Sequence, residues 1–256
     1  MLRSIVYLIA GTFALSAAPA PADDFRMESK VYVGDEQQPA VENTTLFRAG
    51  RVYDYLGEPA RVAIFDPARR RFILLDEARR LRTEVATEDV LAFSMKLQSV
   101  AAQSKNKVLI FAANPKFTTN FSTEQNRLDL SSQYFSYSIE GATAPNDQAA
   151  EQIREFSDWY ARLNSMLNPG ATPPFARLVV NEELKQRKLV AKNVSLTLAK
   201  QAAGGARGLT LHSEHQITWR LLPKDRDRLS QTADDLATFK SVSFAAYREP
   251  PATRSK

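Results

Sequence analysis

Residues 209–221 read Leu-Thr-Leu-His-Ser-Glu-His-Gln-Ile-Thr-Trp-Arg-Leu, and their pattern is the strongest indication of the fold. Apolar residues hold alternate positions on one side of it: Leu209, Leu211, Ile217, Trp219 and Leu221. Because side chains alternate between the faces of a β-strand, the pattern predicts one half-buried strand of thirteen residues. At ~3.3 Å per residue it would be roughly 40 Å long. A strand of this length favours a strongly curved, barrel-like sheet.

Further strands are expected on both sides of this segment. The run Phe72-Ile73-Leu74-Leu75 is apolar on both faces and lies between two turns that begin at Asp66 and Asp76. This spacing predicts a meander of hairpins. Alternating or β-prone runs predict the other strands, at residues 25–33, 45–56, 117–121, 128–140, 190–198 and 242–246.

Helices are expected in four places. One begins near Thr87, which can cap it; another runs from about residue 146 to 167; the others cover about 173–188 and 225–240. The second has an apolar stripe at helical spacing, formed by Ala149, Ile153, Phe156, Tyr160, Leu163 and Leu167. Regular β-α-β alternation is absent, so we expect an α+β fold: a strongly curved antiparallel sheet, an incomplete barrel, with three to four helices on its concave side.

The amino-acid composition limits the classes of protein to which the chain can belong. The chain has 256 residues, of which 44% are hydrophobic and 25% charged, as in soluble globular proteins. It contains no cysteine, which excludes disulfides, thiolate nucleophiles and cysteine-based metal sites. The net charge of +5 favours an anionic surface but is too small to indicate a nucleic-acid partner. We expect a single domain over residues 23–249 and a disordered tail over 250–256.

The N-terminus has the pattern of a signal peptide. Arg3 precedes an uncharged apolar run over residues 5–15, and Ala20 and Ala22 hold the positions of an A-x-A cleavage site. The alternative is a membrane anchor, but this run is shorter than the ~20 residues that a span requires. We therefore expect residues 1–22 to be removed between Ala22 and Asp23, leaving no transmembrane anchor on an exported protein, periplasmic or extracellular.

Arginine is concentrated at the two predicted turns of the meander. The six residues are Arg69, Arg70, Arg71, Arg79, Arg80 and Arg82. Arginine binds phosphate and carboxylate groups well, so these residues are a candidate patch for anionic lipid headgroups, cell-wall polymers or an acidic partner. The alternative is structural, because charges on solvated turns and edges prevent strands from pairing wrongly.

His212, Glu214 and His215 are the only cluster of metal-ligand residue types. On a strand, His212 and Glu214 share one face and His215 points to the other, so the three cannot bind one ion. We expect no metal site, with His212 exposed and His215 buried or at a rim. None of the G-x-S-x-G, P-loop, G-x-G-x-x-G or H-E-x-x-H motifs is present, so no catalytic residue or cofactor is assigned.

The order of these elements resembles that of the periplasmic lipoprotein-carrier (LolA-like) family. The resemblance covers much of residues 25–222 and lies in the strand-rich start, the meander from Val62 to Asp76 and the later long strands. It implies helices forming a lid over an apolar cavity, and a non-enzymatic carrier of a lipid or lipoprotein. No functional residue of the family can be matched to a position here.

Three classes of function therefore remain open. A carrier for a lipidic or other hydrophobic ligand requires an apolar cavity that side chains leave unfilled. An envelope structural or adaptor protein requires a filled core and a surface such as the arginine-rich turns. An exported hydrolase requires a cleft with convergent carboxylates or a histidine of perturbed pKa.

The signal-peptide pattern gives a direct prediction. The exported protein should begin at Asp23, because Ala20 and Ala22 fit the small-residue pockets of a signal peptidase. N-terminal sequencing of the exported protein checks this, and a sequence that starts at Met1 would contradict it.

Overall fold

The computed structural model describes residues 24–168, 170, 172–203 and 208–249. The expected signal peptide, its cleavage point at Ala22 and Asp23, and the expected tail at 250–256 lie outside these residues. Within them, the strands are β1 (Phe25–Val33), β2 (Val41–Arg48), β3 (Arg51–Leu56), β4 (Arg61–Asp66), β5 (Arg71–Asp76), β6 (Leu81–Ala86), β7 (Thr118–Ser122), β8 (Arg127–Ser131), β9 (Phe135–Thr143), β10 (Leu189–Leu198), β11 (Leu209–Thr218) and β12 (Lys240–Ser241).

The α-helices follow first a group of six strands and then a group of three, and they alternate with single strands only towards the C-terminus. They are α1 (Thr87–Ala102), α2 (Lys107–Ala113), α3 (Asp147–Leu167), α4 (Phe175–Gln186), α5 (Lys200–Ala203), α6 (Pro223–Thr238) and α7 (Phe244–Arg248). A short 3-10 helix, η1 (Pro67–Arg69), forms the turn between β4 and β5. This distribution is that of an α+β protein, as expected.

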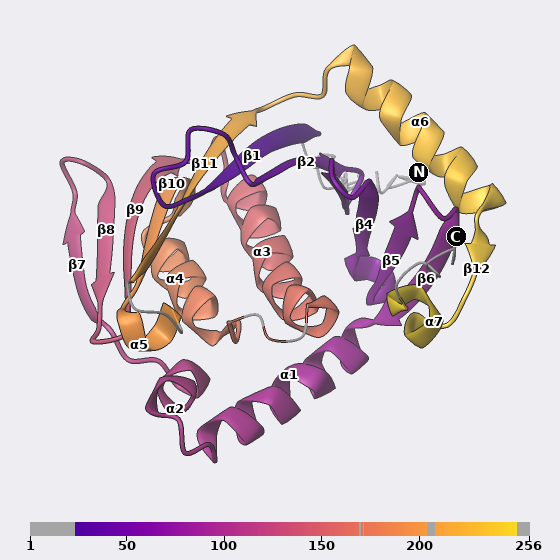
Figure 1. Cartoon of the computed structure of the whole chain (residues 1–256). Helices are drawn as coiled ribbons and strands as arrows, with labels where there is room; N and C mark the ends of the chain where they lie inside the picture. Colours follow the sequence, from indigo (N-terminus) through magenta and orange to yellow (C-terminus); the bar gives the residue numbers. More distant parts are fainter. Residues whose placement is uncertain (1–23, 169, 171, 204–207, 250–256) are drawn as a thin grey trace, which may run out of the picture.

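All the strands belong to one 12-stranded sheet in the order β12-β6-β5-β4-β3-β2-β1-β11-β10-β9-β8-β7. Every pairing is antiparallel except that of the two-residue β12 with β6. Figure 1 shows the sheet as an arch around α3 and α4. Its two edge strands, β7 and β12, do not pair with each other, so the barrel stays open. The predicted incomplete barrel is confirmed.

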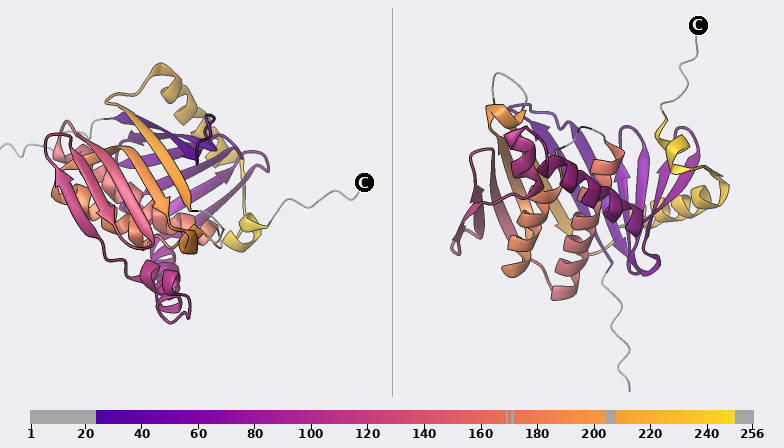
Figure 2. Two further views of the ribbon diagram at one scale, coloured as in Figure 1. Left: turned by 60° about the vertical axis from the view of Figure 1, so that its left-hand side comes forward. Right: turned by 90° about the horizontal axis from the view of Figure 1, so that it is seen from below.

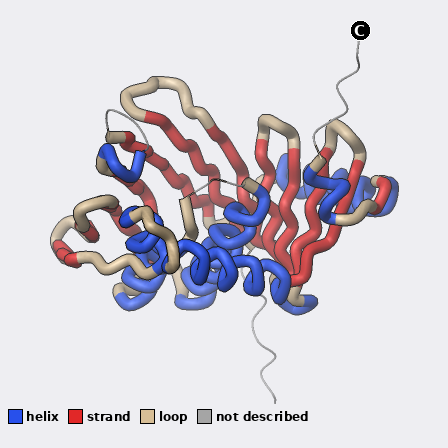
Figure 3. The backbone as a smooth tube through the Cα atoms, turned by 60° about the horizontal axis from the view of Figure 1, so that its bottom comes forward, coloured by secondary structure: helices blue, strands red, loops and turns tan. Residues whose placement is uncertain are grey.

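The concave side of the sheet carries α1, α2, α3 and α4 (Figures 2 and 3). The apolar stripe of α3 packs there, with Ala149, Ile153, Phe156 and Leu163 buried against residues of β1 to β6. The second half of the concave face packs against α4 and α2, through side chains such as Val180. Asn146 caps α3, because its Oδ1 accepts a hydrogen bond from the backbone N–H of Ala149 at 2.8 Å.

The convex face of the sheet is covered by α6. Its side chains Leu229 and Leu236 pack on a separate cluster of β2 to β5 residues that includes Tyr55 and Ile64. The first turn of α6 is also tied to the sheet by charge, because Asp225 lies 3.6 Å from the buried guanidinium of Arg26. The sheet is therefore buried on both faces over its β2–β5 region.

The long C-terminal strand is shorter than its alternation predicts. β11 ends at Thr218, so it has ten residues instead of thirteen. Trp219 is 38% exposed, and Leu221 is buried in the convex cluster with α6 rather than on the face of Leu209. The reason is that the chain must leave the sheet before Pro223, which begins α6.

Two other expectations differ from the structure, and one helix, α2, was not expected. Thr87 is the first residue of α1 and not its cap, since its hydroxyl donates to the backbone carbonyl of Arg70 at 3.0 Å. Helix α2 has too few residues for periodicity to reveal it. The expected strand over 242–246 is largely helix α7, because the Ser243 hydroxyl accepts from the N–H of Ala246 and starts a helix.

We expect the α3 stripe to hold the fold together. Replacement of Leu163 by alanine removes a fully buried side chain and should lower the free energy of unfolding by about 2–5 kcal/mol. The control Met95→Ala, at a residue that is 62% exposed on α1, should change it by less than about 0.5 kcal/mol. Urea denaturation followed by circular dichroism measures both, and equal effects would contradict this account.

Candidate ligand-binding cavity

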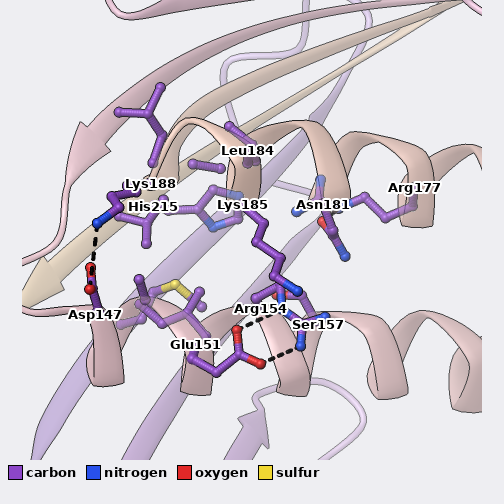
Figure 4. A pocket seen from close by; sticks show the side chains of 16 residues that line it. Asp147, Glu151, Arg154, Ser157, Arg177, Asn181, Leu184, Lys185, Lys188 and His215 are labelled. Carbon is purple, nitrogen blue, oxygen red and sulfur yellow. Dashed lines mark hydrogen bonds and ion pairs between the residues drawn. The ribbon is translucent and has the colours of Figure 1, made fainter.

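A cavity of about 250 Å³ lies between α3 and α4, above the middle of the sheet. Figure 4 shows the two helices side by side with the lining side chains between them. The sheet side is formed by residues of three strands: Met27 of β1, His215 of β11, and Leu189, Val190 and Ala191 of β10. The cavity therefore lies over the strands that join the two halves of the sheet.

The inner wall of the cavity is apolar. Met27, Ile153, Leu184, Leu189 and Val190 line it, and each is at most 9% exposed. Leu189 can take this position because Gly141 lies beside it on β9; a Cβ at Gly141 would lie only 2.9 Å from the Leu189 side chain. The wall can therefore hold an apolar group of a ligand away from water.

The mouth of the cavity is charged and exposed. Asp147 forms an ion pair with Lys188 at 3.5 Å, and both side chains are more than three-quarters exposed. Glu151 accepts a hydrogen bond from Nε of Arg154 at 2.9 Å, which lowers the pKa of the Glu151 carboxyl. Lys185 lies at the same mouth and is also exposed. The rim is therefore open to water, whereas the inner wall is apolar and buried.

A chain of polar side chains crosses the deeper part between the helices. Nε of Arg177 donates to Oδ1 of Asn181 at 3.0 Å, and Nδ2 of Asn181 donates to Oδ1 of Asp158 at 2.7 Å. Arg154 donates to the other carboxylate oxygen of Asp158 at 2.6 Å. Asn181 is only 4% exposed, and burial lowers the pKa of the Arg177 guanidinium. This chain fixes where the cation of Arg177 lies.

His215 is the polar group on the sheet side of the cavity. Its Nδ1 lies 2.8 Å from the hydroxyl of Ser29 on β1, and its Nε2 lies 3.2 Å from the hydroxyl of Ser213. Burial lowers the pKa of the imidazole to about 4, and the positive charge of Arg177 adds to this effect. His215 is therefore uncharged at neutral pH.

The contact between Ser29 and His215 has the atoms of a nucleophile and its base. A working pair also requires a group that orients the base, and here the second nitrogen faces a hydroxyl rather than a carboxylate. With a pKa near 4, the imidazole is also a weak base at neutral pH. This arrangement does not have the geometry of a hydrolase site.

His212 lies on the opposite face of β11 from His215, as the alternation predicts. Its side chain is 38% exposed, and its Nε2 lies 3.6 Å from Glu214. The described residues hold no group of three or more histidine, aspartate or glutamate side chains that could bind a metal ion.

The six arginines of the two turns do not form one surface. Arg69, Arg70 and Arg71 lie at the β4–β5 turn, at one end of β5. The β5–β6 turn places Arg79, Arg80 and the nearby Arg82 at the opposite end. Since β5 has six residues, the two groups are roughly 20 Å apart. The candidate patch is therefore divided.

Most of these arginines have partners within the protein. Arg69 pairs with the buried Asp66 at 3.2 Å, and Arg70 pairs with Glu88 at 2.7 Å. Arg79 binds Asp76 at 2.9 Å and also donates to the backbone carbonyls of Tyr247 and Glu249. Arg71 pairs with Glu84 and lies 4.0 Å from Asp66, and Arg80 lies over the ring of Phe239. The arginines thus stabilise the turns and anchor α7.

Sequence reasoning missed the cavity residues Arg177 and Asn181. A single arginine in a helix usually indicates a solvated face. Two signals were nevertheless present: the spacing of four residues, which brings both side chains to one helix face, and a cation in a first turn that contains no acid.

The shifted pKa of His215 predicts a pH effect on stability. Between pH 6.5 and about 4 the unfolded chain binds a proton at this site and the folded chain does not. The free energy of unfolding should therefore fall as the pH drops through this range. In the His215→Gln variant this fall should be smaller by up to about 3 kcal/mol. Urea denaturation at several pH values measures it. The control His212→Gln should follow the unmodified protein, and identical profiles for all three would contradict the burial of His215.

No protein-family model matches the chain. No curated protein matches it either. Among solved structures, a LolA superfamily protein from Nitrosomonas europaea aligns with 81% of this chain and 90% of its own, at 8% sequence identity and a TM-score of 0.25. This is a weak resemblance in fold, and it supports no inference about a ligand or an activity.

Proposed function

We propose that the protein is a non-enzymatic binding or carrier protein for a hydrophobic ligand, and that the α3–α4 cavity is its binding site. One observation carries this proposal: side chains leave a cavity with an apolar inner wall unfilled, although the core beside it is packed. Protein interiors normally contain few voids of this size. An apolar pocket with a few polar groups at its edge is the usual form of a small-molecule site.

The size of the cavity limits the ligand. An apolar cavity of about 150 Å³ holds benzene, and drug-sized sites measure about 300–1,000 Å³. At about 250 Å³, this cavity fits a single short chain or one ring. A lipoprotein or a multi-chain lipid could place at most part of one chain in it.

The cell envelope is the proposed location. The basis is the sequence of residues 3–22, with its basic start, apolar run and A-x-A site. Among the described residues, no helix has both the length and the apolar character that crossing a membrane requires. An adaptor role through the arginine-rich turns has less support, because those side chains already pair with groups of the same chain.

Ligand binding can be tested with a variant that fills the cavity. We expect octanol or octanoate to bind the protein saturably in calorimetric titration. Ala150→Phe puts a ring into the cavity from α3 and should weaken the binding at least tenfold. The matched control Ala92→Phe, at an exposed position of α1, should bind like the unmodified protein.

Native mass spectrometry of freshly purified protein adds a second measurement, in which a small hydrophobic molecule should be found bound. Absence of saturable binding of both compounds would reject the proposed function. Unchanged binding by Ala150→Phe would place the ligand elsewhere on the protein.

A further inference from the structure

The cavity contains more positive than negative charge. Four cations line it, Arg154, Arg177, Lys185 and Lys188, against the two carboxylates of Asp147 and Glu151. Arg154 and Lys188 are paired with carboxylates. Within the described part of the chain, Arg177 and Lys185 have no carboxylate within 4.0 Å. Lys185 is exposed at the mouth, whereas Arg177 lies deeper and is partly buried, so Arg177 is the partly buried cation of the four that has no carboxylate partner.

The guanidinium of Arg177 is hydrogen-bonded within the protein through its Nε only. Of its five N–H donors, the one on Nε is used by Asn181. No hydrogen bond between described residues uses the four donors on its two Nη atoms. Neither Nη atom is among the fully buried side-chain atoms that lack a partner, so both stay accessible, and a guanidinium fork matches the two oxygens of a carboxylate or phosphate. The free end of Arg177 is therefore suited to a ligand oxyanion.

The surroundings of Arg177 offer no competing charge at close range. Tyr137 and His215 are the ionisable groups of the sheet that interact with it, and both are neutral at pH 7, because burial raises the pKa of Tyr137 and lowers that of His215. The nearest acid, Asp158, is separated from Arg177 by the amide of Asn181. Arg177 also lies in the first turn of α4, where the helix dipole disfavours a cation. A bound anion would relieve this cost.

We propose that the ligand is a small hydrophobic acid whose oxyanion is bound by the two Nη groups of Arg177, while its apolar chain lies against Met27, Ile153 and Leu184. This inference rests on the proposed function, since it uses the same cavity. The headgroup chemistry is that of a carboxylate or a phosphate ester on one short apolar chain. Asn181 and Asp158 are positioning residues that hold the guanidinium.

Calorimetric titration with octanoate, octyl phosphate and octanol tests the headgroup. We expect at least one of the two anions to bind at least tenfold tighter than octanol. If octanoate is preferred to octyl phosphate, the ligand is a carboxylic acid, and the reverse order identifies a phosphate ester. Arg177→Met should abolish the preference for the anion while octanol still binds.

Arg162→Met is the matched control, because Arg162 is a partly buried arginine of α3 that does not line the cavity. It should keep the preference of the unmodified protein. If Arg177→Met does not fold, as judged by circular dichroism, Arg177→Gln replaces it; the introduced amide is uncharged and reaches less far than the guanidinium, so the same loss is expected.

Two failures can be told apart. If octanol and both anions bind equally, or if the Arg177 variants keep the preference, the oxyanion site is wrong while the hydrophobic cavity stands. If none of the three compounds binds, the proposed function itself is wrong.

Discussion

The antiparallel pairing of β1 with β11 holds the whole fold together. It runs from Arg26 opposite Thr218 to Val33 opposite Leu211, between segments at the two ends of the chain. Strands β1–β6 form one meander and β7–β11 the other half, and only this pairing makes them one sheet. Without it there would be no continuous concave face for α3 to fill. Such non-local pairing is also expected to make folding slow.

The cavity results from the way in which α3 and α4 pack over the β1–β11 pairing. Phe156 and Leu163 of α3 fill the concavity on the β1–β6 side, and Val180 of α4 fills the other. Between the helices the contacts are polar instead, because Asp158 and Asn181 bond to each other. Apolar side chains there would have closed the gap. Hydrogen-bonded polar side chains therefore stand where packing alone would favour a filled apolar core. Polar groups in such a place are typical of a binding site.

Sequence patterns predicted most of the fold because they report on local burial. Alternation located β1 and β11, and helical spacing located α3 almost to the residue, from the expected 146–167 to the observed Asp147–Leu167. The end of β11 was misplaced because alternation continues through Leu221 after the chain has left the sheet. Contacts between distant segments leave no such pattern. The division of the arginines between two ends of β5 and the meeting of Arg177 with His215 follow only from tertiary packing.

The central claim is that a small hydrophobic molecule occupies the space between α3 and α4, over the β1–β11 junction. Methyl NMR during titration with octanoate tests this most directly. Saturable shifts are expected for the methyl groups of Met27, Ile153 and Leu184, which line the cavity, and none for Met95, which is exposed on α1. Shifts confined to Met95 and its neighbours, or the absence of any saturable shift at the cavity methyl groups, would contradict it.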